Sequence, residues 1–323
     1  MIKRFLGMPY RWAIMYSVFL TFAVAYVLLD TFVIPKSYMS AADNLPMVSR
    51  TAGNQTDYDD VSPTKDTSEA IESVITEETP KPRISDTYYA DENIVINIET
   101  LRAYNTTIHI ADISVTDINY FKCALAENTF GRNISGKTSV IAGQRNAIFA
   151  VNGDYYGFRD VGYVVRNGTL YRGTGNNEAL ILFKDGNFAV SDETDISSES
   201  VQSAWQIWSF GPALIKEGSI SVTTNSEISG RSSNSNPRTA IGMIEPLHYI
   251  FIVSEGRTND NQGLSLFQLA GIFDERKCTT AYNLDGGGSS TMYFNGNLVN
   301  NPTTNGTRIN EREVSDIVYI GYE

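Results

Sequence analysis

The sequence predicts an α+β fold: a single strand-rich domain with a mixed or antiparallel sheet core and a few packed helices, preceded by one transmembrane helix. Three observations support this class. Short runs rich in Val, Ile, Phe and Tyr recur beyond residue 86 and are bounded by Asn, Asp and Gly, as strands usually are. Several of these runs are separated by two-residue turn sequences. Only one segment has clear helical spacing of its apolar residues.

The transmembrane helix is predicted over residues 12–35. Its first 18 residues, from Trp12 to Leu29, carry no charge, and the apolar run resumes before Pro35, which is long enough to cross a bilayer. Basic residues lie in the tail 1–11, so the positive-inside rule predicts a cytoplasmic N-terminus and an extracytoplasmic domain. A cleaved signal peptide is the alternative, because Ala23-Val24-Ala25 resembles a cleavage site. We favour an uncleaved, single-pass anchor in the cell membrane.

Residues 36–85 differ in composition from the rest of the chain. They are rich in Asp, Glu, Ser, Thr and Pro and have few aromatic residues. Such a segment cannot bury enough apolar surface to offset the entropy lost on ordering. We therefore predict a disordered acidic stalk. It would keep the domain formed by residues 86–323 near the membrane and let that domain move on a flexible tether.

The elements of that domain are predicted from local patterns. Asn167-Gly168, Asp185-Gly186 and Asn295-Gly296 each lie between apolar runs and predict tight hairpins. A helix is expected over residues 264–272 and a weaker one over Ser197–Trp205. Strands are expected over Asn93–Ile98, Thr106–Val115, Tyr120–Ala124, Ala147–Val151, Gly162–Val165, Ala179–Phe183, Arg238–Ile244, Tyr249–Val253, Ala281–Leu284, Thr291–Phe294 and Val314–Ile320.

Composition excludes several classes of function. The net charge of −12 argues against nucleic-acid binding, which depends on Lys and Arg neutralising phosphates. The chain has two histidines and two cysteines, too few for a Cys/His zinc cluster, and no EF-hand spacing supports a calcium site. We therefore expect no metal and no cofactor. Cys123 and Cys278 could form a disulfide outside the cytoplasm or remain two buried thiols.

The most informative segment is glycine-rich and directly follows an apolar run. Glycines let the backbone approach a ligand closely, and hydroxyls and free amides can bind anionic oxygens. The Walker phosphate loop is excluded because no Gly-Lys-Ser/Thr follows. A purely structural turn is the alternative. The residues concerned are Asp285, Gly286, Gly287, Gly288, Ser289 and Ser290.

A second segment, Ala150–Tyr156, is also a predicted strand that ends in polar residues. Asn152 could bind a sugar hydroxyl, Asp154 could act as an acid, a base or a ligand, and Tyr155 and Tyr156 could stack on a sugar ring. The alternative is an ordinary turn built on Asn152-Gly153.

Two further segments contribute arginines. Arg238, followed by Thr239, enters a strand otherwise made of small and apolar residues. Such an arginine is either a buried ion-pair partner or a bidentate clamp for phosphate or carboxylate. Glu255 and Arg257 follow the Tyr249–Val253 strand and add one more carboxylate and one more guanidinium. Taken alone, that pair would be a surface salt bridge.

Taken in order, these segments resemble the phosphodiester glycosidase family, which includes N-acetylglucosamine-1-phosphodiester α-N-acetylglucosaminidases. The resemblance runs from about Ala147 to Tyr319. One departure is that the family commonly has Asp-Gly-Arg where this chain has Glu255-Gly256-Arg257. The matching runs are Asn152-Gly153, Phe210-Gly211-Pro212-Ala213-Leu214-Ile215, Pro237-Arg238-Thr239-Ala240-Ile241-Gly242 and Asn283-Leu284-Asp285-Gly286-Gly287-Gly288-Ser289-Ser290-Thr291.

The resemblance implies hydrolysis of the sugar C1–O bond in sugar-1-phosphodiesters. The phosphate is already a good leaving group, so the site needs cations and donors around it and a carboxylate to stabilise an oxocarbenium-like transition state or activate water. The catalytic candidates are Asp285, Asp154 and Glu255. The candidates for substrate and phosphate binding are Asn152, Arg238, Thr239, Arg257, Gly286, Gly287, Gly288, Ser289 and Ser290.

Two other functions compete with this interpretation. A serine hydrolase using Ser289 or Ser290 would need a base, and neither His109 nor His248 lies in a triad motif. A non-catalytic module for anionic cell-surface glycans would use the same arginines and tyrosines. We expect an enzyme whose partners are a sugar-phosphodiester or glycopolymer, such as a cell-wall polymer or an exopolysaccharide, and the membrane, with no nucleic acid.

Overall fold

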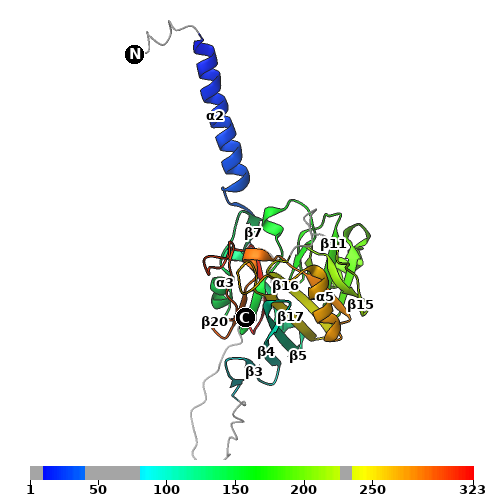
Figure 1. The fold of residues 1–323 in the computed structure, drawn as a ribbon. Helices are drawn as coiled ribbons and strands as arrows, with labels where there is room; N and C mark the ends of the chain where they lie inside the picture. Colours follow the sequence, from blue (N-terminus) through cyan, green and yellow to red (C-terminus); the bar gives the residue numbers. More distant parts are fainter. Residues whose placement is uncertain (1–9, 41–80, 226–234) are drawn as a thin grey trace, which may run out of the picture.

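The computed structural model describes residues 10–40, 81–225 and 235–323. It confirms the predicted class: the domain is strand-rich, has few helices and follows one long N-terminal helix in the chain (Figure 1). The helices are α2 (Arg11–Phe32), α3 (Thr138–Gln144), α4 (Ser198–Ser203) and α5 (Leu266–Glu275). Five short 3₁₀ turns are described as well: η2 (Ile118–Tyr120), η3 (Ala126–Asn128), η4 (Tyr156–Phe158), η5 (Glu193–Asp195) and η6 (Gly287–Ser289).

The described strands form four sheets, and every pairing among them is antiparallel. The strands are β1 (Lys36–Ser40), β2 (Arg83–Ile84), β3 (Tyr88–Ala90), β4 (Ile94–Ala103), β5 (Thr106–Val115), β6 (Phe121–Leu125), β7 (Thr129–Arg132), β8 (Phe149–Asn152), β9 (Val164–Arg166), β10 (Thr169–Arg172), β11 (Glu178–Phe183), β12 (Phe188–Asp192), β13 (Ala204–Trp208), β14 (Ala213–Lys216), β15 (Ser219–Ile220), β16 (Arg238–Glu245), β17 (His248–Ser254), β18 (Thr280–Asn283), β19 (Met292–Phe294), β20 (Asn297–Leu298) and β21 (Asp316–Ile320).

The largest sheet has nine strands in the order β15-β14-β18-β16-β17-β5-β4-β3-β2. Its central strands are apolar on both faces, because successive side chains of a strand point to opposite sides. In β17, Tyr249, Phe251 and Val253 join the main core, whereas Ile250 and Ile252 pack on the other side. This explains why the central strands read as continuous apolar runs rather than as alternating ones.

Both faces of the central strands of the nine-stranded sheet are covered. Helix α5 covers one face through Leu269 and Phe273, and it begins with a capping box between Ser265 and Gln268. The other face contributes to the main core together with strands of two five-stranded sheets, ordered β10-β9-β13-β11-β12 and β20-β19-β8-β21-β6. Helix α3 packs on the far side of the second of these sheets through Ile141. The site described below lies at one end of this layered core.

Local sequence patterns located most of the elements. Each predicted strand overlaps an observed one, and the three predicted turns join β9 to β10, β11 to β12 and β19 to β20. The weaker helix was correct only in part, since α4 ends at Ser203 and Ala204–Trp208 is β13. Pairing with β11 and burial of Ile207 and Trp208 outweigh any local helical preference there.

The predicted stalk begins differently from our expectation. Residues 36–40 are strand β1, which pairs with β7 in a two-stranded sheet. Arg83–Ile84, also assigned to the stalk, pairs with β3 at the edge of the nine-stranded sheet. The prediction of disorder was wrong for these two short strands, because partners distant in the sequence provide their hydrogen bonds. Residues 41–80 lie outside the described part of the chain.

Both cysteines are free and buried. Cys123 belongs to the main core, whereas Cys278 lies in the cluster under α5 on the other side of the nine-stranded sheet. Burial raises the pKa of the Cys278 thiol to about 12 and raises that of Cys123 as well. Of the two alternatives left open by the sequence, the structure has the buried thiols.

Candidate functional site

Three predicted segments meet at one end of the nine-stranded sheet. Strand β16 begins at Arg238, which lies opposite Ser254 at the end of β17. The neighbouring strand β18 ends at Asn283, which lies opposite Ala240. Antiparallel pairing therefore brings the start of β16 and the ends of β17 and β18 to the same edge. The segments that follow or precede these residues form the candidate site.

The glycine-rich segment is held against the start of β16. Leu284 N donates to Thr239 O at 2.9 Å and Gly287 N donates to Pro237 O at 2.8 Å. Gly287 has a φ of 62°, and a Cβ there would lie 2.7 Å from Nη2 of Arg257. The backbone conformation favours glycine at this position, and a Cβ would displace the end of the Arg257 side chain.

Asn152 ties β8 to this segment. Its side chain is fully buried, and its Nδ2 donates to Asp285 O at 2.6 Å. Its Oδ1 accepts hydrogen bonds from Thr239 Oγ1 at 2.7 Å and from Thr291 N at 3.2 Å. Asn152 and Thr239, both predicted to contact substrate, therefore hold the site together from behind rather than present polar groups to solvent.

Asp285 is paired with an arginine that the sequence analysis missed. Arg312 Nη2 lies 2.9 Å from Asp285 Oδ2, and the same nitrogen donates to Ser289 Oγ at 2.6 Å. Burial raises the pKa of Asp285, and the charge of Arg312 opposes that shift. Arg312 stands between Glu311 and Glu313 in the sequence, where it reads as part of a surface charge cluster. Its position shortly before the last core strand was the only available signal.

Three guanidinium groups at this end of the sheet are electrostatic neighbours: Arg312 pairs with Asp285, Arg257 feels the charge of Arg312, and Arg238 feels the charge of Arg257. Burial, and after it the charge of Arg257, lowers the pKa of Arg238 to about 10. Burial and the charge of Arg312 likewise lower the pKa of Arg257, and Asp285 opposes this. Mutual repulsion of this kind indicates a locally positive site in a chain whose net charge is −12. We call Arg238, Arg257 and Arg312 the arginine cluster.

Members of the arginine cluster differ in exposure. Arg238 is buried, and its Nε donates to Leu264 O at 2.9 Å. Arg257 is exposed, and its donors reach Asn236 Oδ1 at 3.2 Å and Thr304 O at 2.7 Å. Among the described residues Arg257 therefore donates to neutral oxygens. An exposed guanidinium with this environment is suited to bind an anion.

The backbone amides of the glycine-rich segment are mostly engaged within the protein. Gly286 N donates to Asp285 Oδ1 at 2.9 Å, and Gly287 N reaches Pro237 O. Ser289 N and Ser290 N donate to carbonyls one turn back. Gly288 packs against Thr304, whose Oγ1 would lie 2.4 Å from a Cβ at that position. The predicted amide donors to phosphate are therefore secondary to the arginine cluster.

Glu255 lies at the same end of the sheet, but its side chain contacts Asn301 and His109 and not the arginine cluster. Its Oε1 accepts hydrogen bonds from Asn301 N at 2.8 Å and from Asn301 Nδ2 at 3.1 Å. His109 Nε2 lies 3.5 Å from the same oxygen. The carboxylate is buried, and both hydrogen bonds are made by one of its oxygens.

Ser290 is buried in the glycine-rich segment, and Asn300 donates to its carbonyl at 2.9 Å.

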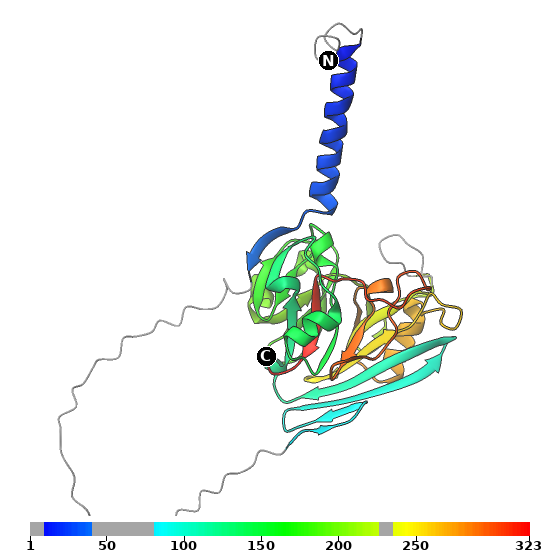
Figure 2. The same cartoon turned by 90° about the vertical axis from the view of Figure 1, so that its left-hand side faces the viewer.

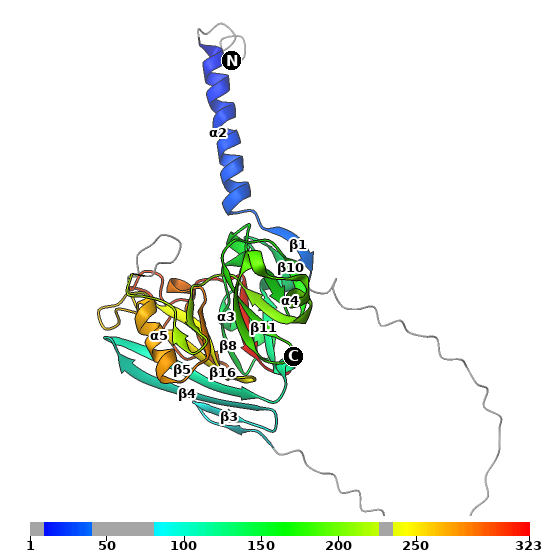
Figure 3. The same cartoon turned by 90° about the vertical axis from the view of Figure 1, so that its right-hand side faces the viewer.

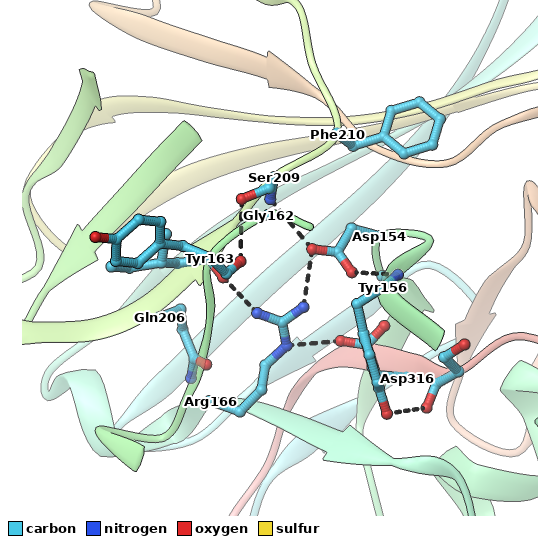
Figure 4. A network of polar contacts seen from close by, with 12 residues as sticks. Asp154, Tyr156, Gly162, Tyr163, Arg166, Gln206, Ser209, Phe210 and Asp316 are labelled. Carbon is cyan, nitrogen blue, oxygen red and sulfur yellow. Dashed lines mark hydrogen bonds and ion pairs between the residues drawn. The ribbon is translucent and has the colours of Figure 1, made fainter. Parts of the chain in front are cut away.

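Asp154 lies in a separate network around Arg166, drawn in Figure 4. Arg166 Nη2 lies 3.0 Å from Asp154 Oδ2, and Arg166 Nε lies 2.7 Å from Asp316 Oδ2. All three side chains are buried. Asp154 also accepts hydrogen bonds from the amides of Tyr156 and Ser209, at 3.1 and 3.2 Å. We call Asp154, Arg166 and Asp316 the buried triad.

The buried triad has two carboxylates for one guanidinium. Burial raises the pKa of Asp316, and the neighbouring Asp154 raises it further, while Arg166 opposes both. The Arg166 guanidinium also lies over the Tyr156 ring, at 5.7 Å from the centroid, and near Trp208. Of the two tyrosines expected to stack on sugar, Tyr156 is thus enclosed, whereas Tyr155 is exposed.

Gly153 connects the two groups of charges. Asp285 N donates to its carbonyl at 3.3 Å, and Gly153 N donates to Asp316 O at 3.0 Å. A Cβ at Gly153 would lie 2.2 Å from Asp316 Oδ1. The buried triad is therefore the support on which the glycine-rich segment and Asp285 rest.

The donor set of the site does not resemble that of a metal centre. Within residues 10–40, 81–225 and 235–323, no three His, Cys, Asp or Glu side chains gather as metal ligands. The polar groups of the site are instead cationic and amide donors with a carboxylate between them, which suits an anionic substrate.

Comparisons with known proteins relate this chain to one family. The model of the phosphodiester glycosidase family matches residues 145–321. An uncharacterised protein from the SPbeta prophage of Bacillus subtilis, YomE, is 28% identical over 196 residues, which are 56% of this chain and 29% of that protein. The mouse N-acetylglucosamine-1-phosphodiester alpha-N-acetylglucosaminidase is 28% identical over 185 residues, 51% of this chain and 35% of the mouse protein. The chain thus spans about a third of the length of these relatives.

A solved structure has the same fold. The catalytic domain of the zebrafish N-acetylglucosamine-1-phosphodiester alpha-N-acetylglucosaminidase, auto-inhibited by its pro-peptide, aligns with a TM-score of 0.57 at 23% identity. The alignment covers 71% of this chain and 83% of the zebrafish domain.

Proposed function

Because this chain belongs to the phosphodiester glycosidase family, we propose that it hydrolyses the sugar C1–O bond of sugar-1-phosphodiesters at the site formed by Asp285 and the arginine cluster. The observation that carries this proposal is the exposed guanidinium of Arg257 beside the Asp285–Arg312 pair. A phosphate diester is an anion that such a site attracts, and a carboxylate lies next to it.

The reaction follows from these charges. Arg257 and Arg312 bind the phosphate oxygens and stabilise the negative charge that develops as the C1–O bond breaks. The phosphate monoester leaves with the bonding electrons, water supplies the oxygen that adds to C1, and the remaining proton goes to solvent. Because phosphate leaves readily, the site needs a carboxylate more than a strong acid.

Asp285 is our candidate for that carboxylate. It is buried at the start of the glycine-rich segment. It is paired with Arg312, which favours its charged form. It would stabilise positive charge at the anomeric carbon or accept a proton from the attacking water. Glu255 remains the second candidate at this end of the sheet. Asp154, which the sequence placed among the catalytic residues, we assign to support of the site, since its oxygens are used within the buried triad and its neighbours.

The N-terminal helix adds a location to this function. Helix α2 has the length and composition to cross a membrane, and none of its residues is buried against the domain. We propose that it is an uncleaved single-pass anchor in the cell membrane with the N-terminus in the cytoplasm and the domain outside. Substrates would then be cell-surface glycoconjugates, including cell-wall or exopolysaccharide polymers.

One observation favours a second candidate function. The three candidate carboxylates are engaged in ion pairs or hydrogen bonds within the protein: Asp285, Asp154 and Glu255. A site whose carboxylates are occupied in this way could bind anionic glycans without hydrolysing them. A binding module would retain the arginine cluster and need no reactive carboxylate.

Release of free sugar distinguishes the two functions. The full chain in detergent would be given the methyl diesters of N-acetylglucosamine 1-phosphate and glucose 1-phosphate, and reducing sugar would be measured. We expect turnover that disappears in Asp285→Asn and persists in Asp260→Asn, which changes a solvent-exposed carboxylate. Saturable binding of the same diesters without turnover would instead establish the glycan-binding module.

A further inference from the structure

The junction between α2 and the domain is short and held by side chains. Helix α2 ends at Phe32 and strand β1 begins at Lys36. Asn133 Nδ2 donates to the carbonyls of Thr31 and Ile34, both at 3.2 Å. Thr31 is in the last turn of α2, where carbonyls have no intrahelical partners. Lys36 Nζ also lies 2.6 Å from Asp30 Oδ2. The helix is therefore clamped to the domain.

Strand β1 completes this clamp. It pairs with β7 from Lys36 opposite Arg132 to Ser40 opposite Thr129. The Tyr38 ring lies 6.1 Å from that of Phe130. Residues 41–80 join β1 to β2, so they begin and end at the domain and do not separate it from the helix. They cannot act as the spacer that the composition predicted.

The clamp fixes which end of the domain is nearest to the membrane. In Figures 1, 2 and 3, which are related by rotation about the vertical axis, the short orange turn η6 lies in the half of the domain nearer to α2. The β3 strand lies at the opposite end. The segment that contains Thr304 and Arg312 crosses η6 through contacts with Gly288. If α2 spans the bilayer, the site lies on the membrane side of the domain.

The surface beside β1 has the charge expected next to an anionic membrane. Tyr38 lines a recess together with Arg132, Arg159 and Arg172, against the single carboxylate of Asp160. Basic residues close to anionic lipids are attracted to the membrane surface. Near the site, Arg308 and the exposed Ile309 line another recess with Thr304. A basic and apolar rim of this kind suits the interface between lipid headgroups and acyl chains.

Size limits how far the site can reach. A compact domain of about 240 residues has a radius of gyration of about 18 Å. A domain clamped to its membrane helix therefore keeps its site within a few tens of ångströms of the bilayer surface, which carries the phosphates of membrane lipids. A polymer outside that zone would be out of reach.

We propose that the substrate is a sugar-1-phosphodiester whose second alcohol is a membrane lipid. This inference rests on the proposed function and narrows it to glycosyl phospholipids held in the same bilayer as α2. Water adds to C1 of the sugar, the C1–O bond breaks, and the lipid phosphate monoester leaves with the electron pair and stays in the membrane. The free sugar is released, and the proton of water passes to solvent.

The test compares two diesters of the same sugar. The full chain would be placed in vesicles of phosphatidylethanolamine and phosphatidylglycerol that carry N-acetylglucosamine 1-phosphate esterified to a long-chain isoprenol. The methyl diester in solution is the second substrate. Confinement to one surface raises the effective concentration, so we expect kcat/KM for the lipid diester to exceed that for the methyl diester by at least about tenfold.

A pair of insertions tests the clamp. About 12 Gly and Ser residues placed between Pro35 and Lys36 add a reach of about 20 Å between helix and domain. This insertion should lower the preference for the lipid diester about fivefold or more while hydrolysis of the methyl diester stays unchanged. The same insertion between Asp60 and Val61 is the matched control, because it follows β1 and leaves the clamp intact.

The outcomes separate the two proposals. Hydrolysis of the methyl diester without preference for the lipid diester would overturn the lipid substrate and leave the proposed function standing. A preference that the insertion at Pro35 does not alter would overturn the role of the clamp. Hydrolysis of neither diester would contradict the proposed function, and the lipid substrate with it.

Discussion

The arginine cluster and the buried triad combine the same chemical groups in opposite proportions. The arginine cluster has three guanidinium groups, of which Arg312 is paired with the carboxylate of Asp285 and Arg257 is exposed. Around Arg166 there are two carboxylates, and all members of the triad are buried. An excess of cations at the surface can bind an anion, whereas an excess of carboxylates in the interior costs stability unless the guanidinium is present. The comparison separates a group of charges that is open to an anion from a buried group that supports the fold.

The largest expected effect is that of removing the Asp285 carboxylate beside the arginine cluster. Asp285→Asn should lower kcat by roughly 10⁴-fold, about 5 kcal/mol of transition-state stabilisation, because an amide cannot stabilise the oxocarbenium-like charge. Substrate affinity should change little, since the arginine cluster remains. Single-turnover kinetics with equilibrium binding measures both, and retained turnover would remove Asp285 from the mechanism.

The next effect concerns stability rather than rate. Arg166→Leu leaves Asp154 and Asp316 buried without their guanidinium, which should lower the free energy of unfolding by about 4 kcal/mol. Denaturant unfolding of the chain in detergent checks this. Arg276→Leu, which removes a partly exposed partner of Glu99, should change stability by less than about 1 kcal/mol. Equal effects of the two variants would mean that the triad does not support the fold.

A smaller effect is expected from exchanging one cation for another. Arg257→Lys keeps the charge but loses the two-pronged donor geometry, so kcat/KM should fall by about 10- to 100-fold, or about 1.4 to 2.7 kcal/mol. The free energy of unfolding should hardly change, because Arg257 is exposed and bonds neutral oxygens. Arg276→Lys serves as the control for activity. A loss of stability as large as the loss of activity would indicate a structural role.

The smallest effect is a pH dependence of stability. The pKa of Asp316 in the folded protein is raised above the value of about 3.9 for an unfolded chain. The folded state thus binds more protons, and the stability linked to this proton is fully present below about pH 4 and is lost as the pH rises through the raised pKa. A tenfold difference in proton affinity between the folded and unfolded chains corresponds to about 1.4 kcal/mol of stability.

Asp316→Asn removes the part of this pH dependence that comes from Asp316. Unfolding of the variant should therefore respond less to pH between about 4 and 8 than unfolding of the natural chain, although Asp285, whose pKa is also raised, contributes in the same direction. Denaturant titrations at several pH values provide the measurement. An unchanged pH profile would assign the linkage to other carboxyl groups.

The fold could be predicted where its determinants are local. Turns such as Asn167-Gly168 and apolar runs such as Tyr249–Val253 specify hairpins and strands within a few residues. Strand β1 was missed because its partner β7 lies about 90 residues away and nothing in Lys36–Ser40 indicates that pairing. The same holds for β13, whose burial depends on β11.

The site, too, could be predicted only where its determinants are local in the sequence. The glycine-rich segment, Arg238 and Arg257 lie at one edge of the nine-stranded sheet, because each flanks a strand of one antiparallel group. The environment of Asp154 depends on Asp316, more than 150 residues further along the chain, so its burial could not be read from its neighbours. Arg312 was missed for the same reason, since only the fold brings it to Asp285.

The pairing of β1 with β7 also bears on how a shortened form of the protein would behave. A chain that begins after residue 40 would leave the backbone of β7 and the ring of Phe130 without their partner strand. Unpaired edges of this kind recruit strands from other molecules. A water-soluble form should therefore keep Lys36–Ser40, and one that omits it should self-associate as its concentration rises.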